Sequence, residues 1–108
     1  MTMSESRNIT TPAVKAIGAL PRAKALKVHG NVYTENGTPD LHACVAGVPY
    51  WLEGKRPGKK PEPIQRKRLM EWHQAGAIVG IIYSAAEAVA IVQGDEAMRA
   101  EAFRRIES

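Results

Sequence analysis

The segment between Asp40 and Lys55 constrains the fold of this chain most, because it has the pattern of a β-hairpin. Its turn residues place the tip at Gly47-Val48, and successive residues along each strand then point to opposite faces. In this register three pairs of residues face each other across the strands: Asp40 and Lys55, His42 and Glu53, and Cys44 and Trp51. The other face carries the apolar side chains that we expect in the core: Leu41, Ala43, Val45, Tyr50 and Leu52. The hairpin therefore predicts one core face and one face with charged groups at its open end.

Length and composition indicate one small globular domain. The chain has 108 residues, of which 44% are hydrophobic, and this is enough for a modest core. The single cysteine, Cys44, excludes a disulfide framework within the chain, and we expect it to be a buried strand residue rather than a catalytic thiol. The sequence has neither the apolar core of a signal peptide nor an apolar run of ~18 residues, so we expect a cytoplasmic protein.

The rest of the chain predicts a mixed α/β domain with elements in the order α-β-β-β-α-β-α and an optional C-terminal helix. We expect helices over residues 8–20, 63–75 and 85–92, and strands over residues 23–29 and 77–83 beside the hairpin. The last strand is continuously apolar, which is typical of a strand buried on both faces. We expect a flexible N-terminus over residues 1–7, the domain over residues 8–93, and a helical tail over residues 94–108. This tail packs either on its own domain or on a second subunit.

Two helices carry local patterns with structural consequences. The apolar stripe of the helix over residues 63–75 is expected to face the core: Leu69, Trp72 and Ala75. We expect Trp72 to be a core residue rather than a platform for base stacking. The spacing of Ser84 and Glu87 predicts a capping box at the start of the next helix.

Three charged residues of the hairpin have the character of a phosphodiesterase site. Asp40, Glu53 and Lys55 share one face, and carboxylates on neighbouring strands lie within reach of one cation. Mg²⁺ suits such a site, because it binds one or two carboxylates together with waters and phosphate oxygens. A lysine beside them can orient water and offset charge that builds up at phosphorus. The pattern thus predicts metal-assisted hydrolysis of a phosphodiester.

Two other interpretations of these residues stay open. Asp40 can simply begin a strand, with Glu53 and Lys55 as a solvated cross-strand charge pattern. His42, an accessory candidate across from Glu53, can combine with the two carboxylates as a site for a transition metal. We favour Mg²⁺ because the lysine matches phosphodiester chemistry.

Basic residues are concentrated beside these carboxylates. The net charge is +4, and seven of the fifteen lysines and arginines fall within one short segment: Lys55, Arg56, Lys59, Lys60, Arg66, Lys67 and Arg68. A surface that binds phosphates has this composition, although a solvated loop and helix face would have it too. Its position next to the carboxylates favours substrate binding.

The chain resembles the VRR-NUC family of the PD-(D/E)xK nuclease superfamily over about residues 8–92. The ordered set of motifs that carries the resemblance is Gly37-Thr38-Pro39-Asp40-Leu41, Glu53-Gly54-Lys55-Arg56-Pro57, Gln65, and Ala75-Gly76-Ala77 before an apolar strand. The resemblance implies a restriction-endonuclease-like core, in which a mixed β-sheet is flanked by helices. It also implies the roles of the site residues. Asp40, Glu53 and the backbone carbonyl of Gly54 would hold the metal, Lys55 would be catalytic, and Gln65 would shape the site. Glu5 is the nearest match to a further acidic residue of the family, about one residue out of step.

The function that this resemblance implies is that of a Mg²⁺-dependent DNA endonuclease, in which we expect Mn²⁺ to substitute. Small stand-alone members look like phage-type nucleases, which indicates a bacterial or phage-infected cell. The family's relationship to junction resolvases implies a homodimer that cuts branched DNA such as four-way junctions. The residues expected to contact DNA are Lys27, His29, Arg56, Lys59, Lys60, Arg66 and Lys67. The alternatives are a non-catalytic nucleic-acid-binding module with a vestigial metal site, or a nuclease that acts on flap DNA or RNA.

Overall fold

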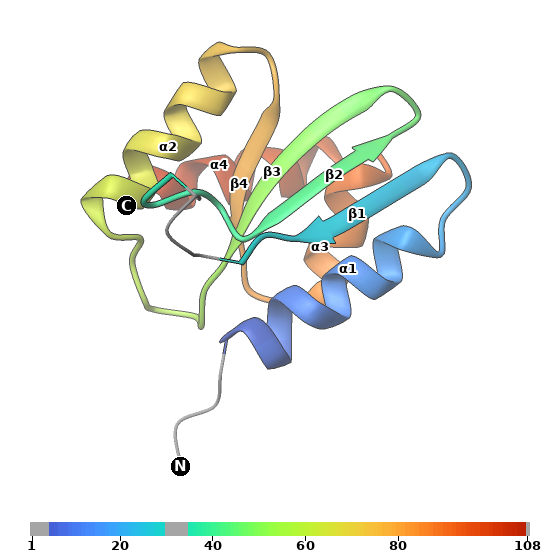
Figure 1. Cartoon of the computed structure of the whole chain (residues 1–108), viewed down its shortest axis with the longest axis horizontal. Coiled ribbons are helices and arrows are strands. Elements are labelled where there is room, and N and C mark those ends of the chain that lie inside the picture. Colours follow the sequence, from blue (N-terminus) through green and yellow to red (C-terminus); the bar gives the residue numbers. More distant parts are fainter. Residues whose placement is uncertain (1–4, 30–34, 108) are drawn as a thin grey trace.

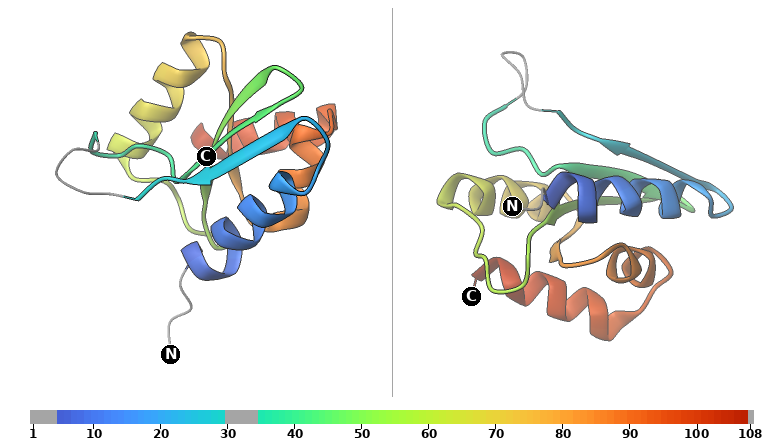
Figure 2. Two further views of the ribbon diagram at one scale, coloured as in Figure 1. Left: turned by 45° about the vertical axis from the view of Figure 1, so that its right-hand side comes forward. Right: turned by 90° about the horizontal axis from the view of Figure 1, so that it is seen from below.

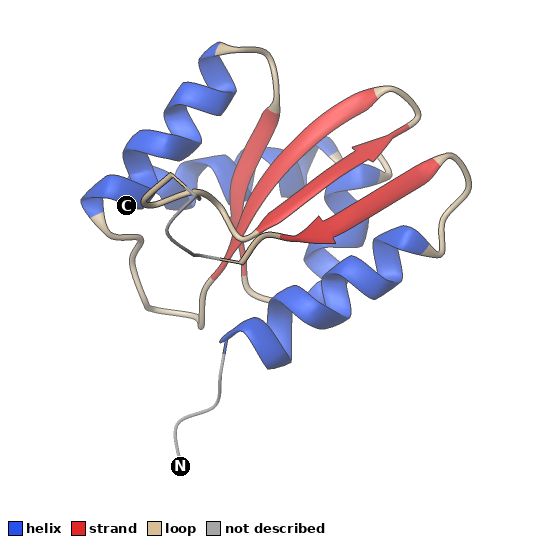
Figure 3. Cartoon of the chain, viewed as in Figure 1, coloured by secondary structure: helices blue, strands red, loops and turns tan. Residues whose placement is uncertain are grey.

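A four-stranded mixed β-sheet with helices on both faces forms the molecule (Figure 1; Figure 3). The computed structural model describes residues 5–29 and 35–107. The helices are a π-helical turn at Ser6–Thr10, α1 (Thr11–Gly18), α2 (Pro63–Gln74), α3 (Ala85–Val92) and α4 (Glu96–Glu107). The strands are β1 (Ala23–Lys27), β2 (Leu41–Val45), β3 (Val48–Gly54) and β4 (Ile78–Ile82). The predicted α/β class and element order are confirmed, and the optional C-terminal helix is present. Of the N-terminus that we expected to be flexible, residues 1–4 lie outside the described residues.

The strands lie in the order β1-β2-β3-β4 across the sheet. β1 and β2 pair antiparallel, as do β2 and β3, whereas β3 and β4 pair parallel. A parallel pair needs a crossover connection, and α2 with its flanking loops provides it. The end of β3 and the start of α2 are therefore joined by the basic loop over residues 55–62.

The register of the β2–β3 hairpin differs from the predicted one by two residues. Val45 pairs with Val48, so the turn is Ala46-Gly47, whose φ angles are 49° and 84°. A two-residue hairpin turn of this kind needs positive φ at both central positions. The predicted tip would have put the β-branched Val48 at positive φ, which is sterically unfavourable. A shift of two residues preserves the faces of the strands, so the predicted clustering of the carboxylates is not lost.

The core under one face of the sheet has the composition that the hairpin predicted. Leu41, Ala43, Val45, Tyr50 and Leu52 are all buried, and they pack against α1 and α3 in one apolar cluster. The apolar stripe of the first helix supplies the facing residues: Ile9, Ala13 and Ile17. This layer holds the hairpin by its apolar face and leaves its charged face toward α2.

The second face of the sheet is covered only in part by the described helices. α2 lies over β3 and β4, where fully buried Leu69 packs with Trp51, Val79 and Ile81. On this second face no described helix lies over β1 and β2, and the right-hand view of Figure 2 shows α3 and α4 on the opposite side of the sheet. Leu26 on β1 is consequently 50% exposed.

This partial cover overturns three expectations about burial. Cys44 is exposed, because it points from β2 to the uncovered half of the sheet. Trp72 is 37% exposed and Ala75 is exposed, so of the predicted inner stripe of α2 only Leu69 is buried. The predicted helix is present, but α2 contacts the sheet over a narrow part of its surface that includes Leu69 and leaves Trp72 and Ala75 exposed.

Helix α4 packs on its own domain. Ala102 and Ile106 are fully buried, and a Cβ atom built on Gly80 of β4 would lie 2.6 Å from the Cβ atom of Ala102. Arg105 links this helix to α3 by two hydrogen bonds to the Glu87 carboxylate, at 2.8 and 3.0 Å. None of the described helices is long and apolar enough to cross a membrane.

The predicted capping box at the start of α3 is half formed. The Ser84 hydroxyl accepts a hydrogen bond from the Glu87 nitrogen at 3.2 Å, as expected. The Glu87 carboxylate instead accepts from the Tyr83 nitrogen and from Arg105. The Glu87 side chain is therefore bound to Arg105 and Tyr83 and does not make the second hydrogen bond of a capping box.

Candidate active site

Two carboxylates meet at the open end of the β2–β3 hairpin. Asp40 lies just before β2, and its backbone nitrogen donates a hydrogen bond of 3.2 Å to Oε1 of Glu53, near the end of β3. Glu53 is 6% exposed and Lys55 is 5% exposed, so both charged groups are buried. The positive charge of Lys55 acts on both carboxyl groups and partly opposes the rise in their pKa that burial causes. The hairpin thus brings Asp40, Glu53 and Lys55 together, as predicted from their shared face.

The Asp40 carboxylate is held by donors from two other segments. Its Oδ1 accepts from the Gly54 nitrogen at 3.2 Å, and its Oδ2 accepts from the Thr10 hydroxyl at 3.0 Å. A Cβ atom at position 54 would lie 2.7 Å from that hydroxyl oxygen, so the close approach requires glycine. Sequence reasoning missed Thr10, which is fully buried, because its only signal was a threonine pair at a helix start.

The first turn of α2 orients the Glu53 carboxylate. Oε1 of Gln65 accepts a hydrogen bond of 2.9 Å from the Glu62 nitrogen, which satisfies a backbone donor at the start of the helix. Nε2 of Gln65 is thereby turned toward Glu53 and donates to its Oε2 at 3.3 Å. The structure brings Gln65 to the place that the resemblance implied, although it does not test a catalytic role.

The loop before Asp40 is held against the same turn of α2. Gly37 has φ of 82°, and a Cβ atom there would lie 2.7 Å from the Ile64 side chain and 2.9 Å from its backbone. Arg68 of α2 donates to the Asn36 carbonyl at 2.9 Å and pairs with Glu35 at 3.1 Å. These contacts fix the approach of the chain to Asp40.

The electrostatics of the site favour a bound cation. Burial, followed by the charge of Asp40, raises the pKa of Glu53 to about 8. Burial also raises the pKa of Asp40, against hydrogen bonds from Gly54 and Thr10 and the charge of Lys55. Without a cation, the pair therefore retains a proton near neutral pH, because burial disfavours the charged form of these carboxyl groups and the two charges repel each other. A metal ion would remove this penalty.

The donor set consists of two carboxylates, Asp40 and Glu53, whose oxygen atoms are ligands of the kind that Mg²⁺ takes. Among the residues that the structure describes, no group of three or more His, Cys, Asp or Glu side chains is placed to share a metal ion. Two carboxylates that leave room for waters and a phosphate oxygen are the usual protein contribution to a Mg²⁺ site. Asp40 and Glu53 would hold it, and the fit rests on their oxygen atoms and their raised pKa values.

His42 does not lie across from Glu53, and this prediction was wrong. The shifted register pairs His42 with Trp51, and the two rings stack with their centroids 4.1 Å apart. Nδ1 of His42 donates to the Tyr50 carbonyl at 3.2 Å. The predicted site for a transition metal built on His42 and Glu53 thus loses its geometric basis.

Glu5 lies at the rim of the site. Its carboxylate accepts from the Arg56 nitrogen at 2.9 Å and pairs with Lys59 at 3.7 Å. Its charge also acts on Glu53 and raises the pKa of that carboxyl group. Glu5 therefore connects the N-terminal helix to the basic loop, close to the two buried carboxylates.

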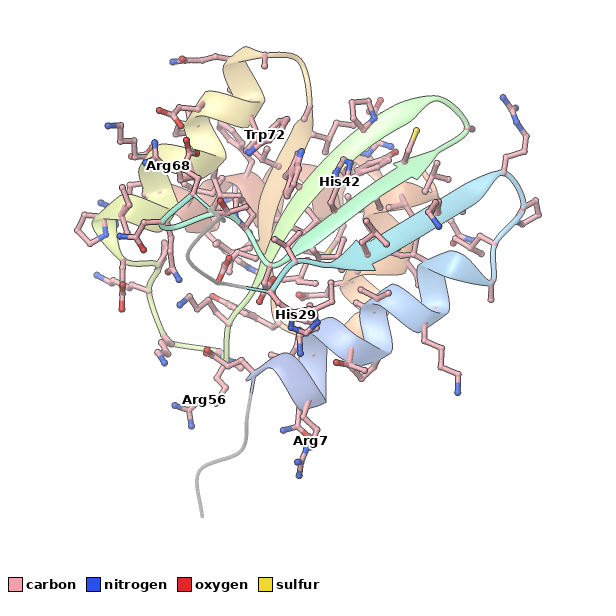
Figure 4. The ribbon with its side chains drawn as sticks, viewed as in Figure 1. Arg7, His29, His42, Arg56, Arg68 and Trp72 are labelled. Carbon is pink, nitrogen blue, oxygen red and sulfur yellow. The ribbon has the colours of Figure 1, made fainter. Side chains whose placement is uncertain are left out.

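The basic residues expected to contact nucleic acid divide into two groups. Most of them are exposed: His29, Arg56, Lys59, Lys60 and Lys67. Lys27 is half-buried on β1, and Nε of Arg66 donates to the Ile106 carbonyl at 2.8 Å. Arg66 thus has a structural contact that the sequence did not indicate. Figure 4 places His29 and Arg56 on the same side of the molecule as Arg7, an exposed residue that sequence reasoning did not single out.

These features define a class of small α/β domain, in which a buried carboxylate–lysine cluster lies at the open end of a hairpin. A search of solved structures finds a chain described as "VRR_NUC domain", with a TM-score of 0.68 and 21% sequence identity, over 85% of this chain and 98% of that one. The chain therefore shares the fold of a VRR_NUC domain, as the sequence resemblance implied. No protein-family model matches the sequence, and a search of curated proteins finds no match.

Proposed function

We propose that this protein is a Mg²⁺-dependent nuclease that hydrolyses phosphodiester bonds in DNA. The observation that carries the proposal is the cluster of half-buried Asp40 with buried Glu53 and Lys55, whose carboxylates accept hydrogen bonds from Gly54, Thr10 and Gln65. Groups with no chemical role are rarely buried together with their charges. The shared fold with a chain described as a VRR_NUC domain also supports a nuclease.

Each residue of the cluster has a distinct part in the proposed hydrolysis. Asp40 and Glu53 would hold the cation, and Gln65 keeps the Glu53 carboxylate in one orientation. Mg²⁺ held there would supply Lewis-acid stabilisation of the phosphoryl oxygens. Lys55 orients the attacking water and offsets negative charge that develops at phosphorus. The water oxygen bonds to phosphorus, the bond from phosphorus to the leaving oxygen breaks, and a water proton is released to solvent or to that oxygen.

The substrate in this proposal is branched DNA, and the active form is a homodimer. A domain this small has little surface with which to read sequence, and the basic loop supplies affinity for phosphates of any sequence. β4 is an edge strand, and a depression of about 500 Å³ beside it is lined mainly by apolar residues such as Ala77, Val79 and Phe103, together with His73 and Arg99. A second copy seated there would place two sites about a two-fold axis, as symmetric cleavage of a four-way junction requires. The exposed thiol of Cys44 suits a reducing compartment, which supports a cytoplasmic site of action.

The test is cleavage of an end-labelled four-way DNA junction beside a linear duplex of matched sequence. It is run with Mg²⁺, with Mn²⁺, with EDTA, and with the Lys55→Ala variant. Paired incisions on the junction alone, absent with EDTA and in the variant, are the expected result. Cleavage of both substrates would keep the nuclease and remove the junction preference. Binding without cleavage of junction, duplex, flap or RNA substrates would overturn the enzyme in favour of a binding module.

A further inference from the structure

Three aromatic rings stack beside the candidate active site. The ring of Trp51 on β3 lies 4.1 Å from that of His42 on β2 and 4.3 Å from that of Trp72 on α2, with interplanar angles of 20° and 25°. The three rings, called the aromatic stack below, therefore connect the sheet to α2. The rings of His42 and Trp72 are 6.5 Å apart, so Trp51 lies between them, and Figure 4 labels these two outer residues.

The aromatic stack borders the half of the sheet, over β1 and β2, that no described helix covers on this face. Trp72 is 37% exposed, and Leu26 on the neighbouring edge strand is 50% exposed. Between β1 and β2 lies a depression of about 230 Å³, lined by Lys24, Leu26, His42 and Cys44. Large apolar side chains exposed together in this way are typical of a binding surface rather than of a core.

Core packing alone does not account for the tryptophan pair. Trp51 is 8% exposed, and its indole nitrogen is buried without a hydrogen-bond partner in the described part of the chain. An unpaired buried N–H group is unfavourable, and a smaller apolar ring would avoid it. The stacking of the broad, flat indole ring of Trp51 on Trp72 and His42 explains a tryptophan at this position.

The aromatic stack lies on the same face of the hairpin as the two carboxylates. His42 follows Asp40 by two residues on β2, and Trp51 precedes Glu53 by two residues on β3. Two residues along a strand correspond to about 7 Å. One or two nucleotides of a strand can span this distance from a phosphate at the carboxylates.

We propose that the aromatic stack, together with Leu26, binds the unpaired bases of a nucleic-acid strand whose backbone passes the Asp40–Glu53 site. This inference rests on the proposed nuclease function, and it adds a single-stranded region to the substrate. Aromatic rings bind bases of any sequence through their faces, which suits a protein with little surface for base recognition. Lys24 at the rim supplies a positive charge for the phosphates, which favours nucleic acid over a neutral apolar partner.

Intrinsic fluorescence reports directly on this surface, because Trp51 and Trp72 are the only tryptophans in the chain. We would titrate the full-length protein in EDTA with short oligothymidylate, with oligouridylate and with a duplex of equal length. Single strands are expected to quench the fluorescence, and the two single-stranded probes separate a DNA preference from an RNA preference. Trp72→Leu is expected to lower the affinity for single strands relative to duplex by about tenfold, whereas Trp72→Tyr largely retains it.

Further variants separate stacking from other effects. The salt dependence of single-strand binding is expected to stay the same in Trp72→Leu, because no phosphate contact is removed. Leu26→Glu, at an exposed position, is expected to weaken single-strand binding without a change in folding. Gln74→Ala, exposed at the end of the same helix, serves as the matched control and is expected to bind like the wild type.

Several results would overturn the inference. The first is a titration in which single strands do not quench the fluorescence. The second is a Trp72→Leu variant that loses affinity for single strands and duplex equally. The third is a dimer that dissociates in Trp72→Leu, because this would assign the face to a second copy of the chain. Lys55→Ala separates this inference from the proposed function. If neither wild type nor this variant cleaves but both are quenched by single strands, the binding surface stands and the nuclease does not. If wild type cleaves and Trp72→Leu binds single strands normally, the nuclease stands alone.

Discussion

Nε2 of Gln65 donates a hydrogen bond of 3.3 Å to Oε2 of Glu53, while Oε1 of the same side chain accepts one from the Glu62 nitrogen at 2.9 Å. One amide therefore closes the start of α2 and orients a buried carboxylate on β3. Because the two bonds use different atoms, substitutions can separate the stability of the helix start from the geometry of the site.

Two substitutions of Gln65 are expected to differ in the hydrogen bonds that they remove. Gln65→Ala removes both, so the free energy of unfolding should fall by about 1 kcal/mol and the cleavage rate by about tenfold or more. Gln65→Glu keeps an acceptor for the Glu62 nitrogen but removes the donor to Glu53, so the helix start should persist while cleavage still falls. Urea unfolding and single-turnover cleavage check this, with Gln74→Ala as the control. Full activity in Gln65→Glu would contradict a role for the Gln65–Glu53 bond.

Stability in the absence of metal is expected to fall as pH rises. Because the folded pKa of Glu53 is about 8 and its ordinary value is 4.5, the folded state binds more protons than the unfolded state between these limits. The favourable contribution is complete below about pH 4.5 and is lost as pH rises through about 8. This contribution of Glu53 to the free energy of unfolding is on the order of a few kcal/mol.

The measurement is urea unfolding at several pH values in EDTA, for wild type and Glu53→Gln. The variant should show a flatter pH dependence and greater stability than wild type above pH 8, because it has no carboxylate to bury. Addition of Mg²⁺ should stabilise wild type at high pH and leave the variant nearly unchanged. Parallel pH profiles for the two proteins would contradict the assignment.

A methyl group at position 54 is expected to disturb the hold on Asp40. Its carbon atom would lie 2.7 Å from the Thr10 hydroxyl oxygen and 3.1 Å from the Ile9 side chain. Gly54→Ala should therefore lower the free energy of unfolding by about 1–3 kcal/mol and also lower the cleavage activity. Thr10→Ala removes the closest clashing atom, so the double variant should be more stable than additivity predicts, by about 0.5–1 kcal/mol. A purely additive result in thermal or urea unfolding would count against this contact.

The ion pair between α3 and α4 is expected to stabilise the fold with the opposite pH dependence. Burial opposes ionisation of Glu87, but hydrogen bonds from Arg105 and Tyr83 and the charge of Arg105 outweigh it and lower the pKa of this carboxyl group. The contribution is therefore present above the ordinary pKa of 4.5 and is lost as pH falls. Arg105→Ala should lower the free energy of unfolding by about 1–3 kcal/mol at pH 7 and by less in acid.

Arg104→Ala is the matched control for this pair, because Arg104 is exposed and bonds to Glu101 on its own helix. Its effect on unfolding should stay within about 0.5 kcal/mol. Cleavage per folded molecule should be unchanged in both arginine variants, since neither residue lies at the candidate site. An equal loss of stability in the two variants would contradict the role of Arg105.

The shared face of Asp40, Glu53 and Lys55 was predictable from sequence, and the exact pairing was not. Side chains alternate along each strand, so any register that differs by an even number of residues keeps Asp40 on the same face as Glu53 and Lys55, whereas a one-residue slip would not. The pairing itself depends on which two residues occupy positive φ in the turn, and Ala46-Gly47 rather than Gly47-Val48 does so. This difference moved His42 from Glu53 to Trp51.

Local patterns of the chain were sufficient for the element order, the apolar face of the hairpin, and the cluster of charges at its open end. They act over a few residues, through side-chain alternation, helical spacing and turn residues. The exposure of Trp72 and Cys44, the bond from Thr10 to Asp40, and the use of Arg66 to bind the end of α4 came from the packing of segments far apart in the chain. Whether a face of a strand or helix is buried depends on what another segment places against it, and no local pattern carries that information.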